Sequence, residues 1–377
     1  MLILFSLVSL VACQLSLVEN EPLDHADSAL TSSSLLADLD VMKIYSGVAY
    51  CKSGLADWSC GPRCDQLSSQ TNDVTFIQSP TKSNAAYATY NQGMNTIVVA
   101  FKGSSNAMNA LQDLASWPTD CEIRRNPDIK VHFGIQAVYL SMRSSLREAF
   151  EQITARHQGA KIAITGHSLG GALASLFALE VAENYPNLVE STFLYTYGAP
   201  RIGNGLYADQ IVQAFGDRVF RVTHRHDIVT QMPTTFMFGN NWQHFSVEYN
   251  VDSRFNIRRC RGREDRECSL RDKFLELETM AEVFASLVNP LTRQDVASHS
   301  LAGYTQGLML DCTEEDDSPL EPPGSRDNRT IDGSSVDDSS FVDVNSFVNE
   351  GSSVDDSSSA VVMGASVLLS VLICTVL

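Results

Sequence analysis

Apolar residues recur along the chain at two spacings, one typical of helices and the other of strands. Within 32–50 they fall on one helical face: Leu35, Leu36, Leu39, Met42 and Tyr45. The same spacing predicts helices over 134–156, 171–184 and 205–215. Apolar runs predict strands over 74–78, 85–90, 96–101, 161–165, 192–197, 218–223 and 245–251. Because strands alternate with helices, we expect an α/β fold with a mostly parallel central sheet flanked by helices.

Residues 14–312 carry this pattern, and the two ends of the chain differ in composition. Residues 1–12 are apolar and too few to cross a bilayer, so 1–13 is predicted to be a signal peptide. Residues 10–13 also look like a bacterial lipoprotein acylation site. Residues 360–377 form an apolar run after a polar stretch, which is the pattern of a GPI-anchor signal and argues against the bacterial alternative. A single membrane-spanning tail is the alternative for this run.

Most of the negative charge lies between the domain and the apolar tail. The formal net charge is −18, and 313–359 holds 13 Asp and Glu against two Arg, a net of −11. The sequence Gly-Ser-Ser-Val-Asp-Asp-Ser-Ser occurs at 333–340 and again at 351–358. Low hydrophobicity and like charge predict a disordered acidic C-terminal stalk, in which Asn328 begins a glycosylation sequon. So acidic a chain is not expected to bind nucleic acid.

Seven cysteines lie between the two predicted signals: Cys51, Cys60, Cys64, Cys121, Cys260, Cys268 and Cys312. Short cysteine spacings in an exported chain predict disulfides. The pair at 60 and 64 could instead contribute to a metal site, but no second ligand pair has the spacing of a zinc site, so no metal is expected. Since seven is odd, one thiol is expected to remain unpaired.

The strongest chemical signal is Ile-Thr-Gly-His-Ser-Leu-Gly-Gly-Ala-Leu-Ala at 164–174. It contains Gly-x-Ser-x-Gly, from Gly166 to Gly170, between a predicted strand and a predicted helix. That is the context of the nucleophile elbow of α/β-hydrolases, where small neighbours allow a tight turn. Ser168 is therefore the candidate nucleophile. His167 is expected to point away from it and to be structural.

A serine hydroxyl needs a base, and the base needs an acid to hold its tautomer and orientation. In α/β-hydrolases the acid follows the serine along the chain and the base follows the acid. Asp227 lies at the end of a predicted strand, where catalytic groups of parallel sheets gather. His299, on a predicted loop, is favoured as the base over His244, which is expected to begin a strand.

Other candidates for these roles are less suitable. Asp209 and Asp217 are expected on a helix or a surface turn, and His224 and His226 at a solvated strand end. Asp227 itself could be a solvated loop carboxylate.

An acyl-transfer site also needs donors aimed at the developing oxyanion. One is expected from the backbone N–H of Leu169, directly after the nucleophile. The other is expected from Ser104, which follows the strand at 96–101 after Gly103 and offers an N–H and a hydroxyl. A Gly-Ser pair ends many strands, so this signal alone is only moderately specific.

Several segments match one family in the same order. Thr165–Gly171 is similar to its nucleophile motif and Phe101–Ser105 to its oxyanion strand. Lys130–Gly134 is similar to Val-His-x-Gly, Tyr197–Asn204 to Gly-x-Pro-Arg-Val-Gly, and Asp227 with Pro233 to its acid segment. Over 45–312 the chain therefore resembles the class 3 lipase family, fungal-type secreted triacylglycerol lipases of the α/β-hydrolase fold. The resemblance implies Ser168 as nucleophile, Asp227 as acid and Ser104 as an oxyanion donor.

The resemblance also implies disulfides and a lid. By similarity Cys51 pairs with Cys312, Cys60 with Cys64 and Cys260 with Cys268, which leaves Cys121 unpaired. Residues 106–113 stand where fungal members carry a helical lid, and Asp113 resembles the acid that supports the oxyanion serine. The chain departs from the family around the base, where Ser298 stands in place of a frequent acidic residue and 271–290 looks like an insertion.

These features predict a secreted or surface-anchored serine lipase that hydrolyses acylglycerol esters through an acyl-enzyme. A lipid or other ester at a lipid–water interface is the expected partner, with no cofactor, and the protein is expected to be monomeric. The predicted location is extracellular, through a GPI anchor or after free secretion. The alternatives are a phospholipase A1 or feruloyl-type esterase on the same scaffold, or an inactive surface binding protein. The apolar cluster Phe236, Met237, Phe238 and Trp242 could line an acyl groove or pack in the core.

Overall fold

The structure is a computed structural model. It describes residues 33–51, 53–79, 84–104, 117–237, 239–246, 248–269, 297–307 and 309–312. The predicted signal peptide, lid segment, insertion, acidic stalk and apolar tail lie outside the described residues. Among the described residues, no helix is long and apolar enough to cross a membrane.

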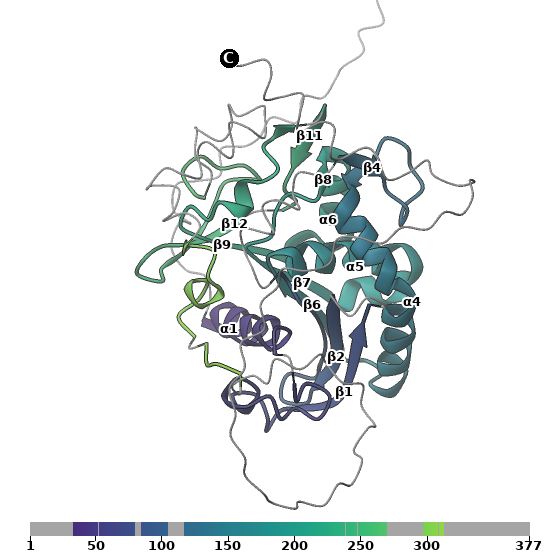
Figure 1. Ribbon diagram of the computed structural model, residues 1–377, viewed down its shortest axis with the longest axis vertical. Coiled ribbons are helices and arrows are strands. Elements are labelled where there is room, and N and C mark those ends of the chain that lie inside the picture. Colours follow the sequence, from purple (N-terminus) through teal and green to yellow (C-terminus); the bar gives the residue numbers. More distant parts are fainter. Residues whose placement is uncertain are drawn as a thin grey trace, which may run out of the picture. The chain divides into compact units, whose positions relative to one another are not determined.

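An eight-stranded sheet forms the centre of the described domain (Figure 1). Its strands in spatial order are β1 (Thr71–Gln78), β2 (Ala85–Asn91), β3 (Thr96–Phe101), β6 (Lys161–His167), β7 (Thr192–Tyr197), β9 (Val219–His224), β12 (Glu248–Val251) and β13 (Ile257–Arg259). The strands from β3 to β12 in this order run parallel. The outer pairs β1–β2, β2–β3 and β12–β13 are antiparallel. The predicted mostly parallel central sheet is confirmed.

Helices cover both faces of this sheet (Figure 1). One face packs against α1 (Ser33–Val48), and the other carries α4 (Phe133–Arg156), α5 (Leu169–Asn184) and α6 (Gly205–Phe215). Successive strand residues point to opposite faces, so β3 feeds two cores. Ile97, Val99 and Phe101 join the apolar cluster beneath α4 and α5, whereas Val98 and Ala100 join the cluster beneath α1. A strand buried on both faces reads as a continuous apolar run, which is why the sequence predicted it.

A second, smaller sheet was not predicted. Its strands in order are β10 (Phe236–Met237), β11 (Asn240–Gln243), β8 (Gly203–Asn204), β5 (Lys130–His132) and β4 (Pro118–Asp120). Strands of two to four residues are too short to show a hydrophobic period. The remaining short elements are α2 (Pro62–Asp65) and the 3₁₀ turns η1 (Pro186–Ser191), η2 (Gly216–Arg218), η3 (Val229–Gln231) and η4 (Leu301–Gly303).

Two local predictions around the later histidines are wrong. The strand predicted over 245–251 begins at Glu248, and His244 lies between β11 and β12 rather than in a strand. His224, predicted to be solvated, is half-buried, and its Nδ1 lies 2.9 Å from the main-chain oxygen of Ser298. Both errors arise from long-range packing that a local pattern does not report.

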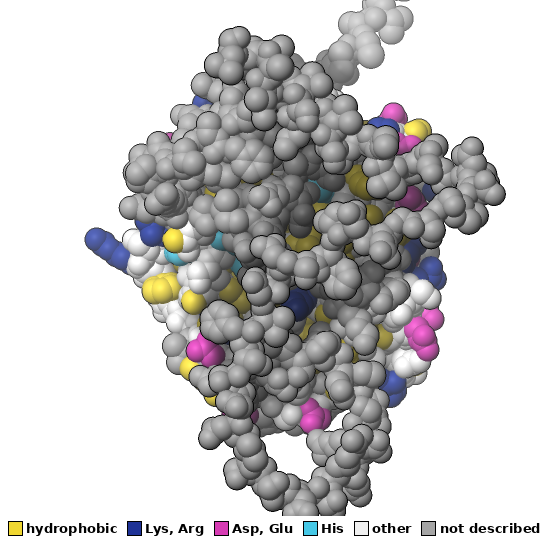
Figure 2. Space-filling model, in the orientation of Figure 1, with side chains coloured by type: hydrophobic (Ala, Val, Ile, Leu, Met, Phe, Trp, Pro, Cys, Tyr) yellow, Lys and Arg dark blue, Asp and Glu magenta, His cyan; other side chains and the backbone are white. Residues whose placement is uncertain are grey.

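Three disulfides join Cys51 with Cys312, Cys60 with Cys64 and Cys260 with Cys268. These are the pairs that the family resemblance implies, and Cys121 is a buried free thiol. The first bond spans 261 positions and so ties α1 to the end of the described domain. On the face drawn in Figure 2, the visible Lys and Arg side chains of the described residues are scattered, with Asp and Glu among them.

Candidate active site

Ser168 occupies a strained turn between β6 and α5. Its backbone has φ 59° and ψ −130°, a left-handed conformation that non-glycine residues rarely adopt. A Cβ added to Gly166 would collide with the backbone of Gly170, and one added to Gly170 would collide with the Phe101 carbonyl. The Ser168 N–H donates to the Tyr197 carbonyl on β7 at 2.9 Å. The two glycines therefore let three backbone segments pack closely enough to hold the turn.

Asp227 lies just after β9 and is fully buried. Its Oδ1 accepts the Val229 N–H at 2.9 Å, and its Oδ2 lies 2.8 Å from His299 Nδ1. The Tyr304 hydroxyl also donates to Oδ2. Burial and then the charge of Asp227 raise the pKa of Tyr304 well above its usual value, so this hydroxyl stays protonated. Since a carboxylate only accepts, both contacts orient donors toward Asp227.

Two polar atoms next to this pair lack a hydrogen bond within the described residues. His299 Nε2 and Ser168 Oγ are both buried, and neither has a hydrogen-bond partner in the described part of the chain. The ring of His167, the residue before Ser168, lies 4.6 Å from the His299 ring. An unsatisfied buried polar atom costs about 1–3 kcal/mol, so such atoms need an explanation. Two of the unsatisfied buried atoms in the described residues are thus an imidazole nitrogen and a serine hydroxyl on neighbouring segments.

His244, the other candidate base, is elsewhere in the core. It is 2% exposed, and its Nε2 lies 2.6 Å from the Thr230 carbonyl. A carbonyl only accepts, so this nitrogen carries the proton. Burial lowers the pKa of His244 well below its usual range, which keeps the ring neutral. Of the two histidines, the structure therefore joins His299 to Asp227, and His244 holds a turn.

The predicted oxyanion donors lie at the same edge of the sheet. Leu169 is the first residue of α5, where helix N–H groups have no partner within the helix. Ser104 follows β3 after Gly103, and a Cβ on Gly103 would collide with the His167 carbonyl and the Tyr50 hydroxyl. The segment that carries Ser104 thus packs directly against the elbow. The positive end of the α5 dipole favours negative charge there.

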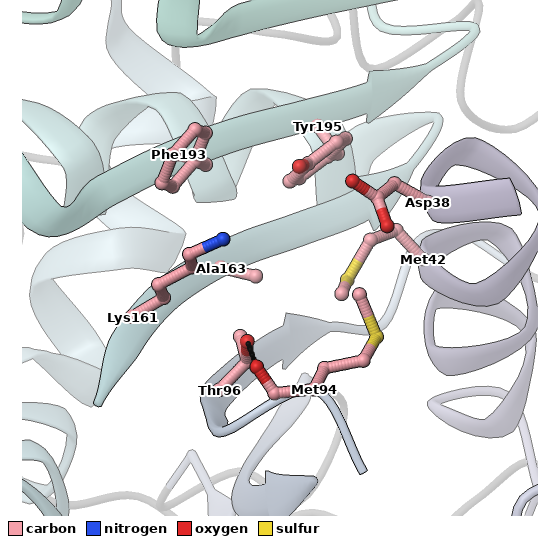
Figure 3. Close-up of a pocket in the computed structure, with 8 residues that line it drawn as sticks. All are labelled: Asp38, Met42, Met94, Thr96, Lys161, Ala163, Phe193 and Tyr195. Atoms are coloured by element: carbon pink, nitrogen blue, oxygen red, sulfur yellow. Dashed lines mark hydrogen bonds between the residues drawn. The ribbon is translucent and has the colours of Figure 1, made fainter. Parts of the chain in front are cut away.

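A cavity of about 200 Å³ lies at the opposite ends of the strands (Figure 3). It is lined by Asp38 and Met42 of α1 and by the first residues of β3 and β6, Thr96 and Lys161. Lys161 Nζ lies 5.9 Å from the centre of the Phe193 ring. Ser168 follows the other end of β6, so this cavity is not part of the candidate active site.

The described residues offer one cluster with metal-ligand atoms close together, at Glu248, Cys260 and Cys268. The two cysteines are joined in a disulfide and so present no thiolate. The cysteines at 60 and 64, considered as metal ligands from their spacing, are likewise bonded to each other.

The apolar cluster after Asp227 is only partly buried. Met237 and Trp242 are buried in the core, whereas Phe236 is 59% exposed. Phe238 lies outside the described residues. The sequence analysis missed Tyr50 and Tyr304 as neighbours of the site and gave His224 no role.

The sheet order, the elbow and the Asp227–His299 pair together define an α/β-hydrolase fold. The family model Lipase (class 3) matches residues 98–237, which include Ser168 and Asp227. The lipase of Rhizomucor miehei is 31% identical over 245 residues, 62% of this chain and 63% of that protein. The chain thus spans just under two thirds of the length of that relative.

Two further proteins are similar. Secreted mono- and diacylglycerol lipase 1 of Fusarium solani is 28% identical over 267 residues, 67% of this chain and 76% of that one. A solved triacylglycerol lipase, in which a serine protease triad forms the catalytic centre, matches with a TM-score of 0.58 and 26% identity, over 67% of this chain and 93% of that chain. These matches support the resemblance of this chain to the class 3 lipase family.

Proposed function

We propose that this protein is a serine lipase that hydrolyses ester bonds of acylglycerols. The observation that carries the proposal is the buried Asp227–His299 pair beside the Ser168 elbow, with Nε2 and Oγ both unpartnered. The names of the relatives support the substrate class: a lipase, a mono- and diacylglycerol lipase and a triacylglycerol lipase.

The proposed reaction has two halves. Ser168 Oγ attacks the ester carbonyl carbon while His299 Nε2 takes the serine proton, and Asp227 holds the imidazolium through Nδ1–H. The Leu169 N–H and Ser104 hold the oxyanion of the tetrahedral intermediate. Its collapse breaks the carbon–oxygen bond to the alcohol, which leaves with the proton from His299. Water then hydrolyses the acyl-enzyme by the same steps in reverse, which releases the fatty acid.

The substrate is best tested with parallel assays of triolein, phosphatidylcholine and methyl ferulate, using Ser168→Ala as the blank. We expect triolein to be turned over fastest. Preference for phosphatidylcholine would indicate a phospholipase A1, and preference for methyl ferulate a feruloyl-type esterase. No turnover of any ester by the wild type would support an inactive binding protein and contradict the proposal.

We further propose that the enzyme acts as an extracellular monomer at a lipid–water interface. Trp117 and Phe133 are 66% and 58% exposed, and the Phe133 N–H donates to the Trp117 carbonyl, so the two residues are neighbours. Exposed aromatic side chains of this kind favour contact with lipid. The rate should rise sharply when a short-chain triacylglycerol exceeds its solubility limit. A rate that follows one hyperbola through that limit would contradict action at an interface.

The predicted ends of the chain complete the proposal. Residues 1–13 would direct secretion and 360–377 would direct a GPI anchor behind the acidic stalk at 313–359. The three disulfides support an oxidising compartment. Expressed in eukaryotic cells, the protein should be released from the surface by a phosphatidylinositol-specific phospholipase C. Retention on the cells after that treatment would favour a membrane-spanning tail, and recovery in the medium without it would favour free secretion.

A further inference from the structure

Two imidazoles hold two successive main-chain carbonyls on the loop that carries His299. His224 Nδ1 lies 2.9 Å from the Ser298 oxygen, and His167 Nε2 lies 2.9 Å from the His299 oxygen. A carbonyl oxygen can only accept, so each of these ring nitrogens carries a proton and donates it. The main chain is therefore fixed at His299 and at the residue before it.

The donor at His224 comes from the same turn as the acid. The Asp227 N–H donates to the His224 carbonyl at 3.1 Å, and Arg225 within this turn has φ 51°. One tight turn thus presents two side chains to the loop. The Asp227 carboxylate meets the His299 ring, and the His224 imidazole meets the main chain one residue earlier.

Gly303 and Tyr304 of this loop pack against the His224 ring. A Cβ on Gly303 would collide with the His224 ring, so a larger residue at this position would displace that ring. The Tyr304 ring packs edge-on against His224, with centroids 5.8 Å apart, and against His167, with centroids 5.5 Å apart. Its hydroxyl then reaches Asp227. Tyr304 therefore lies between the two imidazoles that hold the loop.

The donor at His167 has a fixed tautomer of its own. Burial lowers the pKa of His167 well below its usual range, so the ring is neutral. With the proton on Nε2, its Nδ1 accepts the Tyr50 hydroxyl at 2.8 Å. Because His167 adjoins the nucleophile, replacing it would disturb the elbow as well. His224 is the contact that can be removed separately.

We propose that His224 is a positioning residue for ester hydrolysis, which fixes the main chain at Ser298 so that the His299 ring stays on Asp227 with Nε2 toward Ser168. This inference rests on the proposed function. A single hydrogen bond to Nδ1 would let the His299 ring rotate about that bond. The hydrogen bond from His224 to the Ser298 carbonyl fixes the main chain and so prevents this rotation. A shift of about 1 Å in a reacting group can cost a factor of about 100 in rate.

The test compares variants of the full chain in ester hydrolysis. His224→Leu removes the donor, and we expect kcat to fall by about 10- to 100-fold with KM changed less than about twofold. In His224→Asn the amide nitrogen can stand where Nδ1 stood, so most of the lost kcat should return. The matched control is His226→Leu in the same turn, where Nδ1 lies 3.4 Å from the Ser269 oxygen; its kcat should stay within about twofold of wild type.

The outcomes separate the two proposals. If the wild type hydrolyses no ester, the proposed function fails, and this inference with it. If the wild type is active and His224→Leu keeps its kcat, or His224→Asn loses as much as His224→Leu, only the positioning role is overturned. Should His224→Leu not fold, His224→Asp, which has the shape of Asn without a donor, takes its place; full activity in a folded His224→Asp protein would contradict the proposal equally.

Discussion

The turn that carries Ser168 and the loop that carries His299 are fixed in different ways, although both lie in the candidate active site. The elbow is held by the glycines of its own motif and by the adjoining strands, with close contacts at 101, 166, 170 and 197. The His299 loop depends on side chains far away in sequence: Asp227, 72 positions earlier, His224 and His167. The proposed nucleophile is thus specified by a local motif, whereas the proposed base is specified by the tertiary fold.

The chain after the loop is anchored in the same distant manner. The Lys43 ammonium on α1 donates to the carbonyls of Thr305 and Gly307. Arg63 Nε donates to the Leu310 carbonyl at 2.6 Å, and Cys51 is bonded to Cys312. Residues 297–312 are therefore held at both ends, by the β9 turn and by the α1 region.

The largest expected effects come from replacing the side chains carried by the turn and by the loop, Ser168 and His299. Ser168→Ala and His299→Ala should each lower kcat by about 10⁵- to 10⁶-fold, because members of a triad fail as a unit. His244→Ala should keep turnover within about tenfold, since His244 bonds to the Thr230 carbonyl and not to Asp227. The measurement is kcat on a soluble ester with melting temperature as the folding control. Loss of turnover in His244→Ala alone would reverse the assignment of the base.

The next prediction concerns Asp227, the proposed acid that orients His299. Asp227→Asn keeps the shape of the side chain but presents an amide where the carboxylate met Nδ1–H, so the wrong imidazole tautomer is favoured. We expect kcat to fall by about 10⁴-fold. Steady-state kinetics should show this fall in kcat with an unchanged KM. A loss of less than tenfold would mean that Asp227 is only a structural carboxylate.

Removing each of two disulfides compares the stability contributed by a long-range bond with that contributed by a local one. In the loop-entropy description, the bond across 261 positions stabilises the fold by about 5.5 kcal/mol, and the bond across 4 positions by about 2 kcal/mol. The double variant Cys51→Ser/Cys312→Ser should therefore lose more stability than Cys60→Ser/Cys64→Ser. Urea unfolding of both variants measures the difference. Equal losses would show that the Cys51–Cys312 bond adds no more stability than the short bond.

The smallest effect is the response of stability to pH. Burial lowers the pKa of His167, His224 and His244 below the usual value near 6.5. As pH falls below about 6.5 the unfolded chain takes up protons that the folded chain refuses, so the free energy of unfolding should decrease. That stability is fully present above about pH 6.5.

His244→Gln offers the matched variant, because its amide can still donate to the Thr230 carbonyl. Urea unfolding between pH 5 and 8 should give a shallower slope for this variant than for the wild type. Parallel curves would show that His244 does not contribute to the acid sensitivity.

The sequence predicted most of the large sheet and its helices, because β3, β6 and β7 read as apolar runs and α6 as an amphipathic helix. It also singled out the elbow from one motif. It did not predict the role of His224, because a histidine beside a charged turn looks solvated until Ser298 and Gly303 pack on it. The small sheet was missed because its strands are too short for any period to show.

The most direct test of the central claim is intact-mass and peptide analysis after treatment with a fluorophosphonate. The account predicts one phosphonyl group per chain, on Ser168, formed rapidly in the wild type and in His244→Ala but not in His299→Ala. Absence of the adduct from the folded wild type, or its formation on another residue, would contradict the account.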